Sequence, residues 1–150
     1  MAIALVAAGP ASARVVPGHG IAGVTLRMTQ AQVHARLGPP LGITQTRGAL
    51  GFLVTRLHYP RLDVDLQKLA TRAVVMSVLT SKPGETTASG VGVGSAIAAI
   101  KRLRGARCWT EAGSRYCGIG DRTPLHPSTL FWIGTNAHVT LIEVSLNVNS

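Results

Sequence analysis

Hydrophobic and polar residues alternate along this chain with two different periods, and the clearest local pattern is helical. Between residues 29 and 37, Val33 and the leucine four positions later share one face of a helix. Thr29 can cap the first turn, and Gln32, three residues on, can reach back to complete a capping box. Gly38 suits a left-handed C′ position, and the two prolines after it cannot continue the helix. The pattern predicts a helix over 29–37.

Segments rich in β-branched and aromatic residues occupy much of the remaining chain. The clearest alternation runs through residues 62–67, where three aliphatic residues alternate with two aspartates and a glutamine. A period of two is typical of a strand with one buried and one polar face. Short turns separate the first three segments, so we expect an antiparallel meander. The predicted β segments are 52–59, 62–67, 73–80, 107–118, 129–133 and 139–146.

The second half of the chain repeats the plan of the first. A glycine-rich stretch leads into Ile97, Ile100 and Leu103. Their three-residue spacing predicts a second helix, capped by Ser95 and ended by Gly105. In each half the helix is followed by three β segments, which indicates an internal duplication. The sequence therefore predicts an α+β fold, in which a tandem α-β-β-β repeat packs two helices on an antiparallel sheet.

The first thirteen residues stand apart from this plan. They form a short apolar run that ends in Ala-Ser-Ala, the small-x-small pattern of a signal-peptidase site. No Lys or Arg precedes the run, so either the start codon lies upstream or the segment is only an alanine-rich tail. No later stretch approaches twenty apolar residues, and we expect no stable membrane insertion. We expect a signal peptide at 1–13, truncated if the start codon lies upstream, and a single domain at 14–150, with repeats at about 20–83 and 84–150.

The chain has two cysteines, Cys108 and Cys117. Two thiols without a neighbouring histidine or a second pair cannot complete a tetrahedral metal site. In an oxidising compartment such a pair forms a disulfide, and closing a loop of this length stabilises a protein by roughly 2.5–3 kcal/mol. We therefore expect a structural disulfide and a secreted or cell-envelope location.

Charge adds a candidate partner. Fifteen Lys and Arg stand against six Asp and Glu, which gives a net charge of +9 and favours anionic partners such as cell-envelope polymers. Twelve of the fifteen are arginine, so composition bias of a GC-rich genome is an alternative explanation. Lys101, Arg102, Arg104 and Arg107 cluster after the second predicted helix, where cations also complement the helix dipole. Six aromatic residues and no RNA- or DNA-binding motif argue against a nucleic-acid partner.

Catalytic patterns are missing from the sequence. It contains no Gly-x-Ser-x-Gly elbow, no Ser-x-x-Lys and no Gly-Lys-Ser/Thr phosphate loop. The five histidines lack zinc-ligand spacing. His58, Asp63 and Asp65 could suggest a metal site, but an outward polar strand face explains them without an ion. We predict no enzyme, no catalytic residue, no cofactor and no metal, and we keep a small secreted hydrolase as an alternative.

The candidate binding residues belong to the cysteine hairpin and the strand after it. Pairing the two cysteines places Trp109 opposite Tyr116, on the face that points away from the disulfide. If that face is exposed, two aromatics beside Arg115 have the composition of an interface hot spot. If it faces the helices, they are core residues. Trp132 completes this predicted set of binding residues, which is Trp109, Arg115, Tyr116 and Trp132.

Several of these motifs resemble a known family. They are the stretch from Gly23 to Val33 with Leu37-Gly38-Pro39, the glycine-rich entry at 90–95 and the cysteine hairpin. Together they resemble secreted actinobacterial proteins of the β-lactamase-inhibitory-protein type, and the same repeat shape occurs in the outer-membrane assembly lipoproteins called BamE or SmpA. The resemblance implies a tandem-repeat fold and a protein-binding role, but it carries over no target-reading residue.

Three functional hypotheses follow from the sequence. The first is a secreted, non-enzymatic, protein-binding or inhibitor-like module whose partner is a secreted or envelope protein. The second is an electrostatic binder of anionic cell-envelope polymers, and the third is a small secreted hydrolase. Whether the aromatic residues are exposed decides between a binding role for them, as the first hypothesis requires, and a purely structural role in the core.

Overall fold

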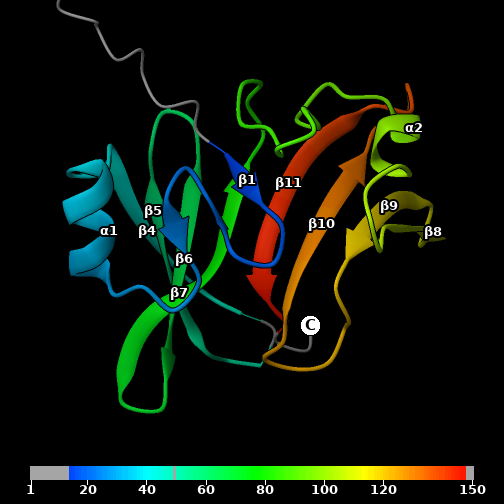
Figure 1. Ribbon diagram of the computed structural model, residues 1–150. Helices are drawn as coiled ribbons and strands as arrows, with labels where there is room; N and C mark the ends of the chain where they lie inside the picture. The colour runs from blue at the N-terminus through cyan, green and yellow to red at the C-terminus, as the bar shows by residue number, and fades with distance from the viewer. Residues whose placement is uncertain (1–13, 49, 148–150) are drawn as a thin grey trace, which may run out of the picture.

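The computed structural model describes residues 14–48 and 50–147, and these form two sheets and two short helices (Figure 1). The predicted signal peptide at 1–13 lies outside the described residues. A small antiparallel sheet at the start of the chain holds three strands of two residues each. These strands and the helices are β1 (Val15–Val16), β2 (Gly20–Ile21), β3 (Val24–Thr25), α1 (Gln30–Leu37) and α2 (Ile97–Ile100).

The main sheet has eight antiparallel strands in the order β4-β5-β6-β7-β11-β10-β9-β8. Strands β7 and β11 lie at its centre, where Val78 stands opposite Val144, and β4 and β8 form its two edges. The strands are β4 (Gly42–Arg47), β5 (Leu53–His58), β6 (Asp63–Leu69), β7 (Arg72–Thr80), β8 (Arg107–Glu111), β9 (Ser114–Ile119), β10 (Pro127–Ile133) and β11 (Val139–Leu146).

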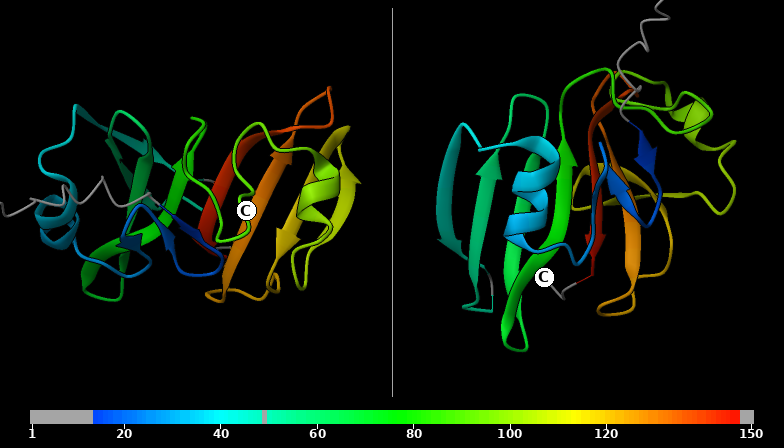
Figure 2. Two further views of the ribbon diagram at one scale, coloured as in Figure 1. Left: turned by 45° about the horizontal axis from the view of Figure 1, so that its top comes forward. Right: turned by 60° about the vertical axis from the view of Figure 1, so that its left-hand side comes forward.

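The core lies on one side of this sheet, which we call the covered face. Both helices and the small sheet pack on that side (Figure 2). Val64, Val78 and Val144 are cross-strand neighbours that are fully buried there. Val33 of α1 and Ile100 of α2 belong to the same apolar cluster. Removing this much aliphatic surface from water is the main source of stability in a fold of this size.

The opposite side of the sheet is the open face, and no helix or strand of the described chain packs over it (Figure 2). Successive side chains of a strand point to opposite sides of the sheet. The neighbours of the core residues therefore lie on the open face. They include Arg56, Asp65, Ser77, Trp132 and Glu143.

The predicted fold class, an α+β tandem α-β-β-β repeat with two helices packed on the sheet, is wrong. The structure is mostly β, with helices of only eight and four residues and a separate three-stranded sheet. Each half of the chain gives four strands to the main sheet, not three β segments. The sequence pattern missed β4 because that edge strand is exposed on both sides, so its residues show no alternation of apolar and polar positions.

The beginning of α1 has the predicted geometry. The Gln32 backbone N–H donates to Thr29 Oγ1 at 3.3 Å, and the Thr29 backbone N–H donates to Gln32 Oε1 at 2.8 Å. These two bonds are the reciprocal pair of a capping box. At the other end, Gly38 has a φ of 79°, a value that favours glycine. No helix of the described residues is long and apolar enough to cross a membrane.

The predicted cap of the second helix is wrong. Ser95 does not cap α2, because its Oγ instead accepts the Gly92 backbone N–H at 2.9 Å. The N-cap residue is Ala96, whose side chain has no capping oxygen. Pairing with the start of β11, including a 2.9 Å bond from Val139 N–H to the Ser95 carbonyl, holds this segment extended. The helix also ends early, at Ile100, because a tighter turn replaces the following helical hydrogen bonds.

Candidate functional site

The disulfide fixes one end of the open face. Cys108 and Cys117 are bonded as predicted, and they join β8 to β9 as directly opposed residues. Cys117 is fully buried on the covered face. Because neighbours in a strand point to opposite sides, Trp109 and Tyr116 lie on the open face. A disulfide of this kind is compatible with an extracytoplasmic location.

Three aromatic side chains form a contiguous group on the open face, which we call the aromatic cluster. The ring centroids of Trp109 and Tyr116 are 5.9 Å apart, and those of Tyr116 and Trp132 are 4.9 Å apart in an edge-to-face arrangement. Trp132 is 37% exposed, whereas the other two are half-buried. Both spacings are favourable for aromatic pairs. The structure thus places the three aromatics outside the core and away from the helices.

The basic residue beside the cluster is not the predicted one. Arg115 stands two positions before Cys117 in a regular strand, so it belongs to the covered side of the sheet, away from the aromatics. Arg122 takes that place, with its guanidinium carbon 5.3 Å from the centroid of the Trp109 ring. Glu111 accepts hydrogen bonds from the Trp109 indole at 3.3 Å and from Arg122 at 3.4 Å. Arg122 lies in a loop, so strand register could not reveal it.

Charged and polar pairs occupy the other half of the open face. Arg56 donates two hydrogen bonds to the Asp65 carboxylate, at 2.6 and 2.7 Å. This bidentate contact raises the pKa of Arg56 and holds a carboxylate that is only 8% exposed. The residues that could have suggested a metal site are thus engaged with partners, since His58 also contacts Asp63, at 2.8 Å.

A chain of hydrogen bonds at the edge of this half has the atom order of a hydrolase triad. Thr44 Oγ1 lies 2.9 Å from His58 Nε2, and His58 Nδ1 lies 2.8 Å from Asp63 Oδ1. The side chains of His58 and Asp63 are 36% and 37% exposed, so water reaches the whole chain. A nucleophile triad works in a site that excludes water and holds oxyanion donors. This exposed row on a strand edge lacks the enclosure, and we assign it no catalytic role.

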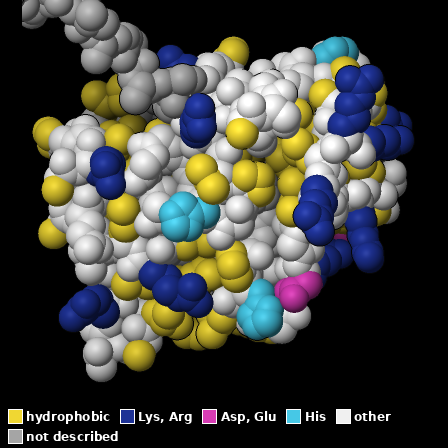
Figure 3. Space-filling model, in the orientation of Figure 1, with side chains coloured by type: hydrophobic (Ala, Val, Ile, Leu, Met, Phe, Trp, Pro, Cys, Tyr) yellow, Lys and Arg dark blue, Asp and Glu magenta, His cyan; other side chains and the backbone are white. Residues whose placement is uncertain are grey.

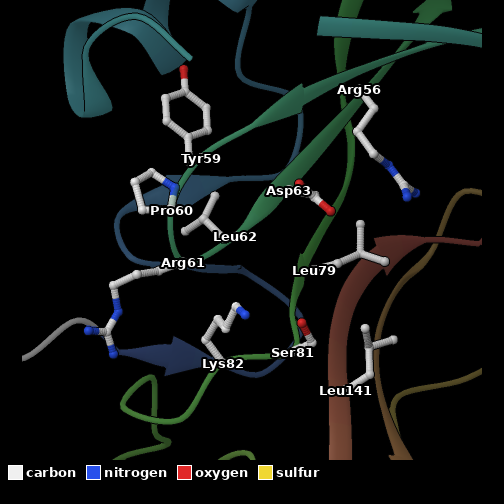
Figure 4. A pocket seen from close by; sticks show the side chains of 10 residues that line it. All are labelled: Arg56, Tyr59, Pro60, Arg61, Leu62, Asp63, Leu79, Ser81, Lys82 and Leu141. Atoms are coloured by element: carbon white, nitrogen blue, oxygen red, sulfur yellow. The ribbon is translucent and has the colours of Figure 1, made fainter. Parts of the chain in front are cut away.

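A shallow pocket of about 150 Å³ opens between this half of the face and the β5–β6 loop (Figure 4). Leu79 and Leu141 form its apolar wall, Asp63 adds a carboxylate, and Lys82 points toward it from the end of β7. No histidine lines it. Ser81 also lines the pocket, which is large enough to receive one side chain of a partner.

Glu143 lies between the aromatic cluster and the charged pairs. The Ser77 hydroxyl donates to its Oε1 at 3.1 Å, and its cross-strand neighbours are Leu79 and Leu130. Burial raises the pKa of Glu143, while hydrogen bonds from Ser77 and Trp132 act in the opposite direction. Sequence reasoning did not select this residue, although a single glutamate within the apolar run of β11 was a visible signal.

The covered side of the molecule has a different surface. Lys and Arg side chains are spread over it, and acidic groups are sparse (Figure 3). The predicted basic cluster is exposed between α2 and β8, and it comprises Lys101, Arg102, Arg104 and Arg107. Four of the six carboxylates lie instead on the open face: Asp63, Asp65, Glu111 and Glu143. The covered side therefore carries the smaller share of the carboxylates.

Comparison with known proteins gives little for function. No protein-family model matches the chain, and no curated protein matches it significantly. Among solved structures there is a distant likeness to a cysteine-rich secretory protein from Staphylococcus aureus subsp. aureus Mu50, with a TM-score of 0.48 and 10% sequence identity. The match covers 86% of this chain and 47% of the staphylococcal chain, so this chain spans about half of that protein. A proposal for the function therefore rests on the chemistry of the open face.

Proposed function

We propose that this chain is a secreted, non-enzymatic, protein-binding module of an inhibitor-like kind, and that it binds a secreted or envelope protein through its open face. The observation that carries the proposal is the aromatic cluster on a sheet face that the described chain leaves uncovered. Tryptophan, tyrosine and arginine dominate the binding energy of protein interfaces. The cluster supplies tryptophan and tyrosine, and Arg122 lies over its Trp109 ring.

The chemistry of the face supports a protein partner over a small molecule. The shallow pocket holds about 150 Å³, which is smaller than the cavities that enclose drug-sized ligands. An interface with a protein needs instead a broad surface with an apolar centre and a polar rim. Half-buried leucines and charged pairs beside the aromatics provide that arrangement. The resemblance of the motifs at 23–33 and 90–95 to β-lactamase-inhibitory-type proteins agrees with an inhibitor-like role.

The test is affinity capture from the culture supernatant and envelope fraction of the source organism, with the purified chain immobilised. We expect a specific protein to be retained by the wild type and lost with Trp132→Ala and with Tyr116→Ala. Truncation of a hot-spot residue weakens binding by about tenfold or more. Circular dichroism of each variant checks that the sheet is intact.

Phe52→Ala is the matched control for this experiment. Phe52 is 58% exposed at the β4–β5 connection, at the other end of the sheet, so its loss removes a similar aromatic area without touching the cluster. The control should retain the same protein as the wild type. Retention that is equal in wild type and Trp132→Ala, or no protein above background, would exclude the open face as the binding surface.

A second candidate function is electrostatic binding of anionic cell-envelope polymers. The basic surface of the covered side favours it, because that surface carries few carboxylates to offset its charge (Figure 3). Binding of the chain to isolated cell walls should then weaken steeply as salt rises. Replacing Lys101, Arg102 and Arg104 together by glutamine should reduce it further. Salt-insensitive retention, or none, would rule this candidate out.

A further inference from the structure

Glu143 differs from every other carboxylate of the chain in its partners. The chain has six acidic residues, all within the described part. Five of them have a basic side chain within 4 Å: Asp63 with His58, Asp65 with Arg56, Glu85 with Arg61, Glu111 with Arg122 and Asp121 with His126. Glu143 has none among the described residues, and residues 1–13, 49 and 148–150 contain no Lys, Arg or His. The chain has fifteen Lys and Arg, yet Glu143 is the one carboxylate of the described residues without a basic side chain within 4 Å.

The surroundings of Glu143 make the missing cation costly. Its carboxylate lies between Leu79 and Leu130 in the middle of the sheet, and burial is the first cause of its raised pKa. The Ser77 hydroxyl and the Trp132 indole are neutral donors and replace lost hydration only in part. Asp65, on β6 two strands away from β11, adds a like charge. Arg56 acts on Glu143 as a more distant cation, but its guanidinium is bound to Asp65 by two hydrogen bonds. A half-buried charge without an ion-pair partner is less favourable in the free protein than it would be beside an added counter-charge.

The position of Glu143 also indicates how a counter-charge would arrive. The residue lies on the open face beside Trp132, the most exposed member of the aromatic cluster. A basic side chain that reaches Glu143 from outside therefore passes along an aromatic ring, where a cation is attracted to the π face. A shared divalent metal fits less well, because the nearest second carboxylate, Asp65, is already held by two bonds from Arg56.

We propose that Glu143 is the anchor for a lysine or arginine side chain of the protein partner, which ion-pairs with the carboxylate while its aliphatic stem packs against Trp132. This inference rests on the proposed function, since it specifies the partner of the same face. It deepens that function by stating the chemistry of the partner: a basic side chain flanked by apolar groups. The partner's cation would supply the ion pair that the other five carboxylates form within this chain and Glu143 does not.

The test uses a random dodecapeptide display library, selected on the wild-type chain, and measures peptide affinity by fluorescence anisotropy. We expect Trp132-dependent peptides that contain a Lys or Arg next to apolar residues. Glu143→Gln should weaken their binding at least tenfold, and replacing the peptide arginine by citrulline, or the lysine by norleucine, should cost the wild type a similar factor. Asp121→Asn is the matched control, because it makes the same change of charge at an exposed loop residue. It should leave the affinity unchanged.

The outcomes separate this inference from the proposed function. Trp132-dependent peptides that bind Glu143→Gln as tightly as the wild type, or that need no basic residue, would overturn the cation anchor and leave the protein-binding face in place. If no selected peptide depends on Trp132, both proposals fail. Glu143→Gln must also keep its fold, and since it removes an unpaired charge we expect its melting temperature to equal or exceed that of the wild type.

Discussion

Across the two central strands of the sheet, the Ser77 hydroxyl of β7 donates a hydrogen bond of 3.1 Å to Glu143 Oε1 of β11. The bond is short enough to orient the carboxylate, but a neutral hydroxyl only partly offsets the loss of hydration of a half-buried negative charge. Burial accordingly raises the pKa of Glu143 above its usual range in spite of this bond. In spite of the bond from Ser77, the ionised form of Glu143 is therefore less favourable in the folded protein than in the unfolded chain.

The first prediction concerns pH and Glu143→Gln. The groups that face the carboxylate are Ser77 and Trp132 as donors, Arg56 as a cation and Asp65 as an anion. Because the folded pKa is raised, ionised Glu143 lowers the free energy of unfolding above that pKa, and protonation removes the penalty. The variant should be more stable than the wild type at pH 7. The difference should shrink as pH falls from the raised value toward the unfolded value of about 4.3.

Urea unfolding at pH 7 and near pH 4 measures this difference. Asp121→Asn is a control of opposite sign, because a backbone hydrogen bond from Thr123 lowers the pKa of Asp121. That group stabilises the fold above its unfolded pKa and ceases to do so as pH falls. A Glu143→Gln variant that is less stable than the wild type at pH 7, or a gap that does not change with pH, would contradict the prediction.

The second prediction concerns the Arg56–Asp65 pair. Arg56→Met leaves Asp65, which is 8% exposed, without its two hydrogen bonds and its counter-charge. We expect a loss of about 1–3 kcal/mol in the free energy of unfolding. A larger loss is not expected, since the Arg56 side chain is 40% exposed and water screens the pair.

A double variant separates the charge effect from lost packing. Arg56→Met with Asp65→Leu removes both charges, so it should recover much of the stability that Arg56→Met alone loses. The exposed Arg122–Glu111 pair provides the comparison, and Arg122→Met should change stability by only about 0.5 kcal/mol. Equal effects of the two single substitutions would show that burial of Asp65 does not matter.

The sequence pattern located most strands of the main sheet, but it did not predict the fold class of the protein. Apolar residues of the inner strands alternate with polar ones because a single face is covered, and this gives a period of two that the sequence displays. The edge strand β4 has no such period, because both of its faces are exposed. The second helix has the spacing of a helix at Ile97 and Ile100, but β11 holds its entry extended. Pairing with a distant strand cannot be read from local spacing.

The candidate site was predictable only where register could be deduced. Opposed cysteines fix the β8–β9 pairing, so the position of Trp109 opposite Tyr116 followed from sequence alone. Arg115 was assigned to the aromatic face although its strand position places it on the other side. Arg122 could not be predicted, because the path of a loop decides its place over Trp109. The lack of an ion-pair partner within 4 Å of Glu143 among the described residues is a property of the three-dimensional arrangement.

The third prediction concerns the start of α1. Thr29→Ala removes the side-chain oxygen that accepts the Gln32 backbone N–H, so one donor of the first turn loses its partner. We expect a loss of about 1 kcal/mol in the free energy of unfolding by urea. Gln32→Ala removes the reciprocal bond and should cost less, because the backbone N–H that it frees is exposed to water. If Thr29→Ala matches the wild type, the capping box contributes nothing to stability.

The last prediction concerns the disulfide at the edge of the sheet. Strand β8 is an edge strand that pairs only with β9, and the bond between Cys108 and Cys117 links the two strands in addition to the short turn between them. Reduction releases the unfolded chain from a short loop, and we expect a loss of about 2–3 kcal/mol in the free energy of unfolding. Since Trp109 and Tyr116 lie on these same two strands, fraying of β8 should also change tryptophan fluorescence and weaken any binding that depends on the aromatic cluster.

Urea unfolding with and without dithiothreitol measures the loss in the free energy of unfolding. The variant with Cys108→Ala and Cys117→Ala is the control, and it should not respond to the reductant. A wild type whose stability is the same in both conditions would show that β9 holds β8 through hydrogen bonds and packing alone.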